Sequence, residues 1–294
     1  MDRADVVTLR NGFTGPHELL RTSDGAVLFL RRWDTPRAHG VSVLIFHGIT
    51  AHSGPYGSIL GQALADGGYP VYGLDLRGHG LSDGVRGDYP STERYAADLS
   101  EAVEFVKARS PKLVLLGHSL GVLSALRAQQ VRPEDTDGLI LLSAGKQIRT
   151  GVRDRPTAGQ ALEAIIGIGI LRGTPLITYT RREGMVGLDD PLFNFRYSAR
   201  FYTATFGVGA LQVARMFRQG TVDSPYLRPS GRVRIPVLFG VGDQDEYFPV
   251  ESVRQFCDGF DADEKEFLVI PRAKHAAFPP DSWAPLLAWL GEKF

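Results

Sequence analysis

Cysteine is nearly missing from this sequence, since Cys257 is the single cysteine among 294 residues. One thiol cannot form an internal disulfide, which is consistent with a reducing compartment. Cys257 lies in a stretch with helical spacing, far from any candidate base, so we interpret it as a structural thiol rather than a nucleophile. The sequence also lacks a His-Glu-x-x-His pair and clustered cysteine and histidine, so it gives no support for a metalloenzyme.

Net charge and long apolar runs are missing as well. The 33 basic and 33 acidic residues cancel, so nothing favours nucleic acid or an anionic membrane as a partner. The first residues contain no apolar signal segment, and no run reaches the length of a membrane span, so we expect a cytoplasmic protein. Hydrophobic residues at 43% and charged residues at 22% are ordinary for a globular protein.

Short apolar runs alternate with helical spacing along most of the chain. Buried-strand patterns cover residues 41–46, 70–74, 113–116, 138–142, 235–241 and 266–270. Helical patterns cover residues 57–65, 95–106 and 283–290. Near the start, two alternating segments joined by Asp24-Gly25 predict an antiparallel hairpin at a sheet edge. The sequence therefore predicts an α/β fold with a mostly parallel, doubly wound sheet.

Ser119 stands between a strand pattern and a helix pattern, in the stretch Gly117-His118-Ser119-Leu120-Gly121. A turn this sharp strains the serine backbone and brings neighbouring chain close, which requires glycine at positions 117 and 121. The hydroxyl is then expected at the tip of the sheet and at the positive end of a helix. We interpret Ser119 as a nucleophile; the alternative is a loop serine without chemistry. His118 is expected to point away from the hydroxyl, because adjacent side chains diverge.

A serine nucleophile needs a base and a carboxylate that orients the base. His275 follows the last strand pattern and precedes the last helix, at the carboxyl edge where sites in such sheets form. The loop after the preceding strand holds three acids, of which we favour Asp245 over Asp243 and Glu246. The chain order Ser119, Asp245, His275 is the order that this class of sheet uses.

Two backbone amides are expected to stabilise the negative oxygen of a reaction intermediate. The N–H of Leu120 is one, since this residue begins the helix after the nucleophile. The N–H of Ile49 is the other, in the loop after His47-Gly48. The alternative for His47-Gly48 is a tight strand exit without a chemical role.

The regular alternation stops between residues 145 and 231. A helical pattern at 162–171 is apolar nearly all round, and the stretch Gly167 to Gly173 fails as a dinucleotide loop because its third glycine comes one place late and no strand precedes it. Six aromatic residues follow: Phe193, Phe195, Tyr197, Phe201, Tyr202 and Phe206. They either pack this segment onto the core, or line an apolar tunnel or meet a lipid surface. We predict a core of residues 1–144 and 232–294 with an inserted helical cap at 145–231.

With these residues assembled, the chain resembles the α/β-hydrolase superfamily, and within it the monoacylglycerol lipase and lysophospholipase branch. The resemblance rests on His47-Gly48 with residues 52–56, on residues 75–84, on the turn at Ser119 and on the loops of Asp245 and His275. It spans nearly all of residues 10–294 except the insertion, where Asp190-Pro191-Leu192 matches the family. The resemblance implies a mobile helical cap, and supporting rather than catalytic roles for Arg77 and His79. Pro55 departs from the arginine that relatives often carry.

We therefore predict a serine hydrolase that cleaves small, apolar carboxylic esters, such as monoacylglycerols or lysophospholipids, through an acyl-enzyme and without a cofactor or metal. Ser119 attacks, His275 carries the proton, Asp245 orients the imidazole, and the amides of Ile49 and Leu120 hold the oxyanion. Thioesterase, peptidase and specialised-metabolite esterase are alternatives on the same fold. A hydrolase fold that binds an apolar ligand without catalysis is the alternative of another class. Membrane contact through the cap stays open, and the sequence predicts no oligomeric state.

Overall fold

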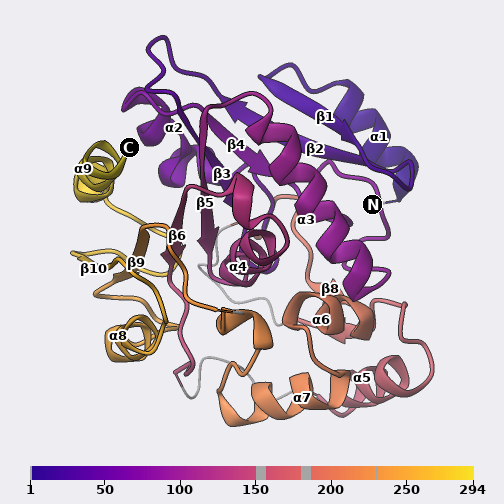
Figure 1. Cartoon of the computed structure of the whole chain (residues 1–294). Coiled ribbons are helices and arrows are strands. Elements are labelled where there is room, and N and C mark those ends of the chain that lie inside the picture. The colour runs from indigo at the N-terminus through magenta and orange to yellow at the C-terminus, as the bar shows by residue number, and fades with distance from the viewer. Residues whose placement is uncertain (1, 150–156, 180–186, 230) are drawn as a thin grey trace.

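The computed structural model describes residues 2–149, 157–179, 187–229 and 231–294, and its centre is an eight-stranded sheet (Figure 1). The strands are β1 (His17–Arg21), β2 (Val27–Trp33), β3 (Val41–Phe46), β4 (Val71–Leu74), β5 (Lys112–His118), β6 (Gly138–Leu142), β9 (Val237–Gly242) and β10 (Lys265–Ile270). Their order across the sheet is β1-β2-β4-β3-β5-β6-β9-β10. The strands from β4 to β10 are parallel, and β1 and β2 form the antiparallel hairpin at one edge. The predicted fold class is confirmed.

Helices cover both faces of the sheet, because side chains along each buried strand alternate between two hydrophobic cores. On β3, Leu44 and Phe46 join the core beneath α3 (Thr92–Lys107) and α4 (Gly121–Val131). Val43 and Ile45 join the core beneath α2 (Gln62–Asp66) and α9 (Ala284–Lys293). The helix α8 (Val250–Asp258) packs on the first of these faces through Phe256. The continuous apolar runs in the sequence therefore reflect burial on both faces.

Two local features differ from the expected pattern. A helix at the start, α1 (Arg3–Asn11), was not expected, because its sequence is mostly polar. It is stabilised by a capping box between Asp2 and Asp5 and by an ion pair of 2.9 Å between Arg10 and Asp83. The helical pattern at 57–65 begins with one turn of π-helix, η1 (Gly57–Gly61), before α2. Short 3-10 turns, η2 (Pro133–Asp135), η3 (Pro225–Leu227) and η4 (Pro280–Trp283), complete the connections.

The segment between β6 and β9 forms helices of its own. They are α5 (Ala158–Gly169), α6 (Ala199–Phe206) and α7 (Ala210–Gln219), with a small hairpin of β7 (Ile177–Thr178) and β8 (Arg196–Tyr197). These helices gather at the lower right of Figure 1, below α3 and α4. The six aromatic residues of this segment are all buried, and four of them, Tyr197, Phe201, Tyr202 and Phe206, join the core beneath α3 and α4. Phe193 and Phe206 also line the cavity described below.

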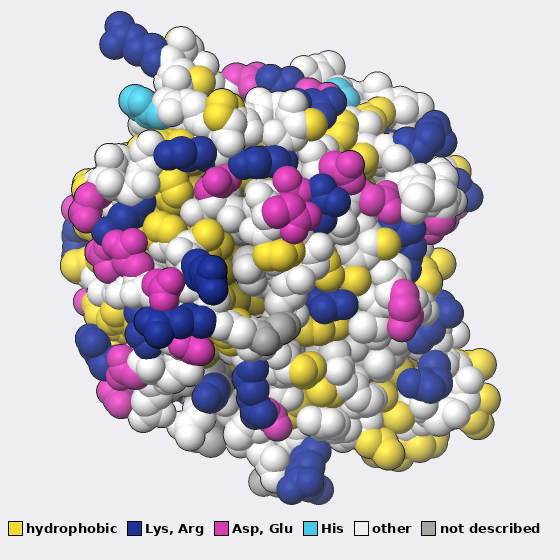
Figure 2. Space-filling view, viewed as in Figure 1, with side chains coloured by type: hydrophobic (Ala, Val, Ile, Leu, Met, Phe, Trp, Pro, Cys, Tyr) yellow, Lys and Arg dark blue, Asp and Glu magenta, His cyan; other side chains and the backbone are white. Residues whose placement is uncertain are grey.

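The outer side of this segment is apolar. Exposed hydrophobic side chains of α5 and its surroundings are Leu162, Ile165, Ile170 and Leu171, and α7 adds Leu211. Figure 2 shows hydrophobic side chains gathered at the lower right, where Figure 1 has α5. Across the described ranges, no helix combines the length and the apolar character that crossing a membrane requires.

A buried carboxylate links α3 to the loop after β4. Asp98 is fully buried and accepts hydrogen bonds from Arg77 at 2.7 and 2.8 Å and from the hydroxyl of Tyr89 at 2.6 Å. A buried carboxylate with these partners is stable, whereas a buried guanidinium that loses its partner is costly. Asp98 therefore fixes the loop that precedes α3.

Replacing this carboxylate should destabilise the protein. Asp98→Asn removes the buried charge that pairs with both Arg77 and Arg94 and leaves Arg77 only its ion pair of 3.0 Å with the exposed Asp24, so we expect the free energy of unfolding in urea to fall by about 3 kcal/mol. Asp223→Asn is the matched control, because its ion pair with Arg228 is exposed and should contribute less than about 1 kcal/mol. Equal unfolding midpoints for the two variants would contradict the structural role of Asp98.

Candidate active site

The turn at Ser119 has the geometry that its two glycines allow. Ser119 follows the end of β5 and has a φ of 57°, in the left-handed region that serine seldom adopts. A Cβ on Gly121 would lie 2.0 Å from the carbonyl oxygen of Phe46, and one on Gly117 would lie 2.4 Å from the carbonyl oxygen of Gly121. Larger residues at these positions would separate α4 from β3 and β5, so the turn depends on both glycines.

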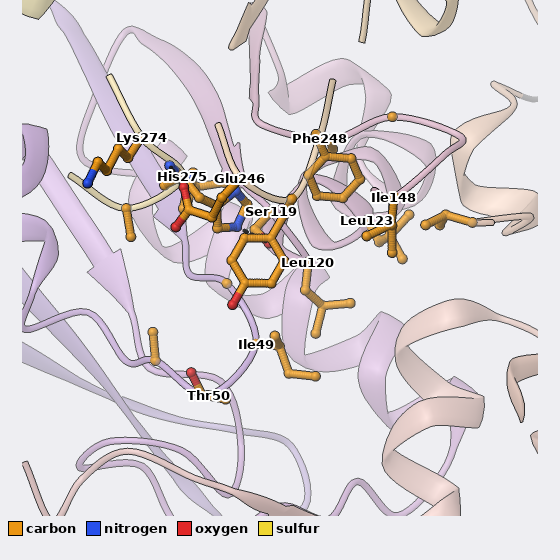
Figure 3. A pocket seen from close by; sticks show the side chains of 18 of the residues that line it. Ile49, Thr50, Ser119, Leu120, Leu123, Ile148, Glu246, Phe248, Lys274 and His275 are labelled. Atoms are coloured by element: carbon orange, nitrogen blue, oxygen red, sulfur yellow. Dashed lines mark hydrogen bonds between the residues drawn. The ribbon is translucent and has the colours of Figure 1, made fainter. Parts of the chain in front are cut away.

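The structure brings Ser119, His275 and Asp245 together, and Figure 3 shows Ser119 beside His275. Ser119 Oγ lies 2.9 Å from His275 Nε2, and His275 Nδ1 lies 3.0 Å from Asp245 Oδ2. The two alternative acids lie elsewhere in the same loop. Asp243 is exposed to solvent, and Glu246 accepts a hydrogen bond from the backbone N–H of His275 at 2.9 Å. Asp245 is therefore the acid that contacts the imidazole ring.

Asp245 is buried yet held in its charged form. Its Oδ1 accepts hydrogen bonds from the backbone N–H groups of Tyr247 at 2.8 Å and Phe248 at 2.9 Å. Burial alone would raise the pKa of this carboxyl, but the neighbouring His275 and these hydrogen bonds outweigh burial and lower the pKa. An ionised carboxylate is suited to accept from Nδ1–H of His275, which leaves Nε2 free to face the serine.

Within the residues that the structure describes, one backbone amide in the loop after β3 lacks the hydrogen bond that each of its two neighbours makes. The N–H of Gly48 donates to the hydroxyl of Tyr56 at 3.0 Å, and the N–H of Thr50 donates to the hydroxyl of Tyr197 at 2.7 Å. Between them, the N–H of Ile49 has no acceptor in the described part of the chain. The two tyrosines thus fix the loop on either side of the amide that the sequence singles out.

Leu120 supplies the second predicted amide. It caps α4 at the N-terminus, where backbone N–H groups have no partner within the helix. Both Leu120 and Ile49 line the same cavity as Ser119. Two N–H groups and the partial positive charge of a helix end are therefore available beside the hydroxyl.

Asp75 holds the two loops that flank the site. Its carboxylate accepts from the N–H of Ser53 at 2.6 Å and from the N–H of Leu81 at 2.8 Å. A Cβ on Gly80 would lie 2.0 Å from this carboxylate, so only glycine fits there. A single buried side chain thus connects residues 52–56 with residues 75–84, the two stretches that carry much of the family resemblance.

Arg77 and His79, which the resemblance gives as supports, lie outside the group that contacts Ser119. Arg77 binds Asp98 as described above. His79 is fully buried, and its ring lies 5.1 Å from that of His47 and 5.3 Å from that of Phe201. Burial lowers the pKa of His47 to about 4 and holds that of His79 well below the usual range, so both rings are neutral. His47 accepts from the N–H of Leu76 at 3.2 Å and bonds to the carbonyl oxygen of Gly48, and His79 bonds to the carbonyl oxygen of Arg77.

The sequence did not indicate the contacts of two site residues, His118 and Tyr56. His118 is directed away from the serine hydroxyl, as expected, but it bonds to the hydroxyl of Tyr56 and to the carbonyl oxygen of His275, each at 2.7 Å. Tyr56 in turn accepts from Gly48. These contacts join positions 62 and 157 residues apart, so no local pattern in the sequence could have indicated them.

Asp190 joins the inserted segment to the first loop. Its Oδ2 lies 2.9 Å from Nε2 of buried His52, and the hydrogen bond from His52 lowers the pKa of Asp190. Nearby, the N–H of Asn194 donates to the carbonyl of Thr50 at 2.9 Å. The Asp190-Pro191-Leu192 match therefore marks the contact between the insertion and the site.

A cavity of about 300 Å³ opens beside Ser119. Apolar side chains dominate its lining: Ile49, Ile59, Leu120, Leu123, Ile148, Phe193, Phe206, Val222, Leu227 and Phe248. Figure 3 shows Lys274, Glu246 and His275 together on one side, with Leu123 and Ile148 on the other. Within the described residues, no group of three or more histidine, cysteine, aspartate or glutamate side chains could hold a metal ion.

Known proteins share this architecture. A family model described as serine aminopeptidase, S33, matches residues 37–279. The monoglyceride lipase of Rattus norvegicus is 33% identical over 130 residues, which are 44% of this chain and 42% of that protein. The chain spans less than half the length of the first curated relatives that it matches, from 11% to 42%.

Solved structures match over nearly the whole chain. The monoacylglycerol lipase of Paleococcus ferrophilus is 25% identical with a TM-score of 0.62, and the match covers 91% of this chain and 99% of that one. A soluble variant of monoglyceride lipase from Saccharomyces cerevisiae, in complex with a substrate analog, is 18% identical with a TM-score of 0.68 and coverages of 95% and 94%. Since the family model covers well over half of the chain and these folds agree with its sheet, the protein belongs to the α/β-hydrolase superfamily, in the S33 serine aminopeptidase family, and is similar to its monoacylglycerol lipase branch.

Proposed function

We propose that this protein is a serine hydrolase that cleaves lipophilic carboxylic esters through an acyl-enzyme on Ser119. The observation that carries the proposal is the 2.9 Å contact between Ser119 Oγ and His275 Nε2, with the other ring nitrogen held by a buried carboxylate. A neutral serine is a weak nucleophile, and a base at this distance is what activates it. The distance between Ser119 Oγ and His275 Nε2 is within the range that proton transfer requires.

The reaction would follow from these contacts in two halves. Ser119 Oγ attacks the ester carbonyl carbon while His275 Nε2 takes its proton, and the carbonyl oxygen becomes an oxyanion at the amides of Ile49 and Leu120. The tetrahedral intermediate collapses, the C–O bond to the alcohol breaks, and His275 returns the proton to the leaving oxygen. A water then repeats the sequence on the acyl-enzyme and releases the acid. Asp245 keeps Nδ1 protonated throughout.

An apolar acyl group is the substrate part that the cavity favours. Its lining is mostly aliphatic and aromatic, and its volume lies at the lower end for small-molecule sites. The names of the relatives, monoglyceride lipases, support a monoacylglycerol or a similar lipid ester. We further propose that residues 145–231 act as a cap, because Tyr179, Phe193 and Phe206 of this segment line the cavity.

A cytoplasmic location remains part of the proposal. Its support is the single cysteine, Cys257, which is buried in α8. A chain without disulfides is suited to a reducing compartment.

Removing the hydroxyl tests the nucleophile. Ser119→Ala should lower kcat on a short p-nitrophenyl ester by at least about 10⁴-fold, since neither acyl transfer nor base catalysis can proceed without the hydroxyl. Initial rates of p-nitrophenolate release measure the effect, with circular dichroism to check folding. Turnover within tenfold of the unmodified protein would eliminate the proposed mechanism.

The assignment of the acid is tested by a matched pair in one loop. Asp245→Asn should lower kcat by about 10⁴-fold, because the amide no longer favours the tautomer in which Nε2 accepts a proton. Asp243→Asn changes an exposed acid two residues away and should keep kcat within about twofold. If the two variants had similar activity, Asp245 would lose its proposed role.

The substrate class is tested by varying the acyl group. Each methylene buried in the cavity contributes about 0.8 kcal/mol, so kcat/KM on glyceryl esters should rise about fourfold per methylene until the cavity is filled. Matched thioesters and aminoacyl anilides, measured in parallel, test the thioesterase and aminopeptidase alternatives. A flat profile across chain lengths would remove the lipid assignment, and faster cleavage of anilides than of esters would favour the peptidase.

A further inference from the structure

His118 lies directly before Ser119, yet its side chain bonds to two other residues of the site, Tyr56 and His275. The imidazole is buried, and its ring centre lies 5.0 Å from that of His275. Nδ1 lies 2.7 Å from the hydroxyl of Tyr56, and Nε2 lies 2.7 Å from the carbonyl oxygen of His275. The proposed mechanism gives this ring no proton to carry, so its two short hydrogen bonds need another explanation.

The direction of each hydrogen bond follows from its partners. A carbonyl oxygen only accepts, so His118 Nε2 carries a hydrogen and donates to His275. Burial, followed by the neighbouring His275, lowers the pKa of His118 to about 3, so the ring is neutral and Nδ1 accepts from the Tyr56 hydroxyl. The oxygen of Tyr56 still accepts from the N–H of Gly48 at 3.0 Å. All the donors and acceptors in this series are thereby satisfied.

This series of bonds connects the two halves of the site. At one end, Gly48 precedes Ile49, which lines the cavity and whose N–H has no acceptor in the described part of the chain. At the other end, the carbonyl belongs to His275, whose backbone N–H is held separately by Glu246 at 2.9 Å. The side chain of Glu246 therefore holds the backbone N–H of His275, and the side chain of His118 holds its backbone C=O. Loop residues otherwise move more than residues within strands and helices.

We propose that Tyr56 and His118 are positioning residues. Through their hydrogen bonds they fix the position of the loop that carries His275 relative to the loop that carries Ile49, with Ser119 between the two. This inference rests on the proposed serine hydrolase function. Neither side chain takes part in bond making or breaking. Their effect is geometric: the distance from His275 Nε2 to the hydroxyl and the placement of the Ile49 amide are set together.

The kinetic signature of this role is a loss of kcat without a comparable change in KM. Tyr56→Phe removes only the hydroxyl that joins Gly48 to His118, and His118→Leu removes the whole connection. We expect each to lower kcat on a p-nitrophenyl ester by about 10- to 100-fold, with KM within about threefold, because small displacements of reacting groups have effects of this size. His118→Gln retains an amide N–H donor and should recover part of the loss relative to His118→Leu.

Tyr95→Phe is the matched control. The hydroxyl of Tyr95 is also buried and lies 2.7 Å from Ser124 Oγ, and neither residue lines the cavity. This variant should lose comparable thermal stability but keep kcat within about twofold. If His118→Leu failed to fold, Tyr56→Phe would still test the proposal through the same comparison.

The outcomes separate this proposal from the function on which it rests. A fluorophosphonate probe should label the unmodified protein and Tyr95→Phe at the same rate. Slower labelling of Tyr56→Phe alone would support the positioning role. Either of two results would overturn the proposal. The first is a kcat of Tyr56→Phe within twofold of that of the unmodified protein, and the second is an activity of His118→Gln no higher than that of His118→Leu. If the unmodified protein neither reacted with the probe nor cleaved esters, the proposed function would fail and this inference with it.

Discussion

The structure of the site depends on the close approach of three backbone segments at Ser119. The carbonyl oxygen of Phe46, at the end of β3, lies 2.0 Å from where a Cβ on Gly121 would be, and Gly117 pairs in register with Phe46 across the sheet. No room remains for a looser turn, so the serine keeps a positive φ. Because β3 ends at this contact, the loop that carries Ile49 begins beside the hydroxyl. The nucleophile and an amide donor are thus placed by the same steric constraint.

The remaining groups lie on loops, and buried hydrogen-bond acceptors hold those loops. Asp245 receives two backbone N–H groups as well as the His275 ring, and Asp75 receives one N–H from each of the two loops that flank the site. A buried carboxylate is costly unless such donors surround it, so each one restricts its loop to the conformation that supplies them. Rigid placement of polar groups is what makes electrostatic stabilisation of a reaction effective.

Local periodicity and chain order were enough to predict the parallel sheet, the turn at Ser119 and the loops that hold Asp245 and His275. Each of these depends on residues that are adjacent in the sequence or on the rule that parallel strands end at one edge. The helix α1 was missed because its stability comes from caps and from the distant Asp83 rather than from an apolar face. The contacts of Tyr56 and His118 were missed because they form only after the loops fold together, and no spacing rule records them.

The account's central claim is a covalent acyl group on Ser119, and acid-quenched mass spectrometry of the protein during turnover of a slow ester tests it most directly. The account predicts a mass increase of one acyl group, located by peptide mapping to Ser119, at the contact of 2.9 Å with His275. The adduct should vanish as the substrate is exhausted. An acyl group located on another residue, or ester turnover with no adduct at Ser119 under conditions where deacylation is rate-limiting, would contradict it.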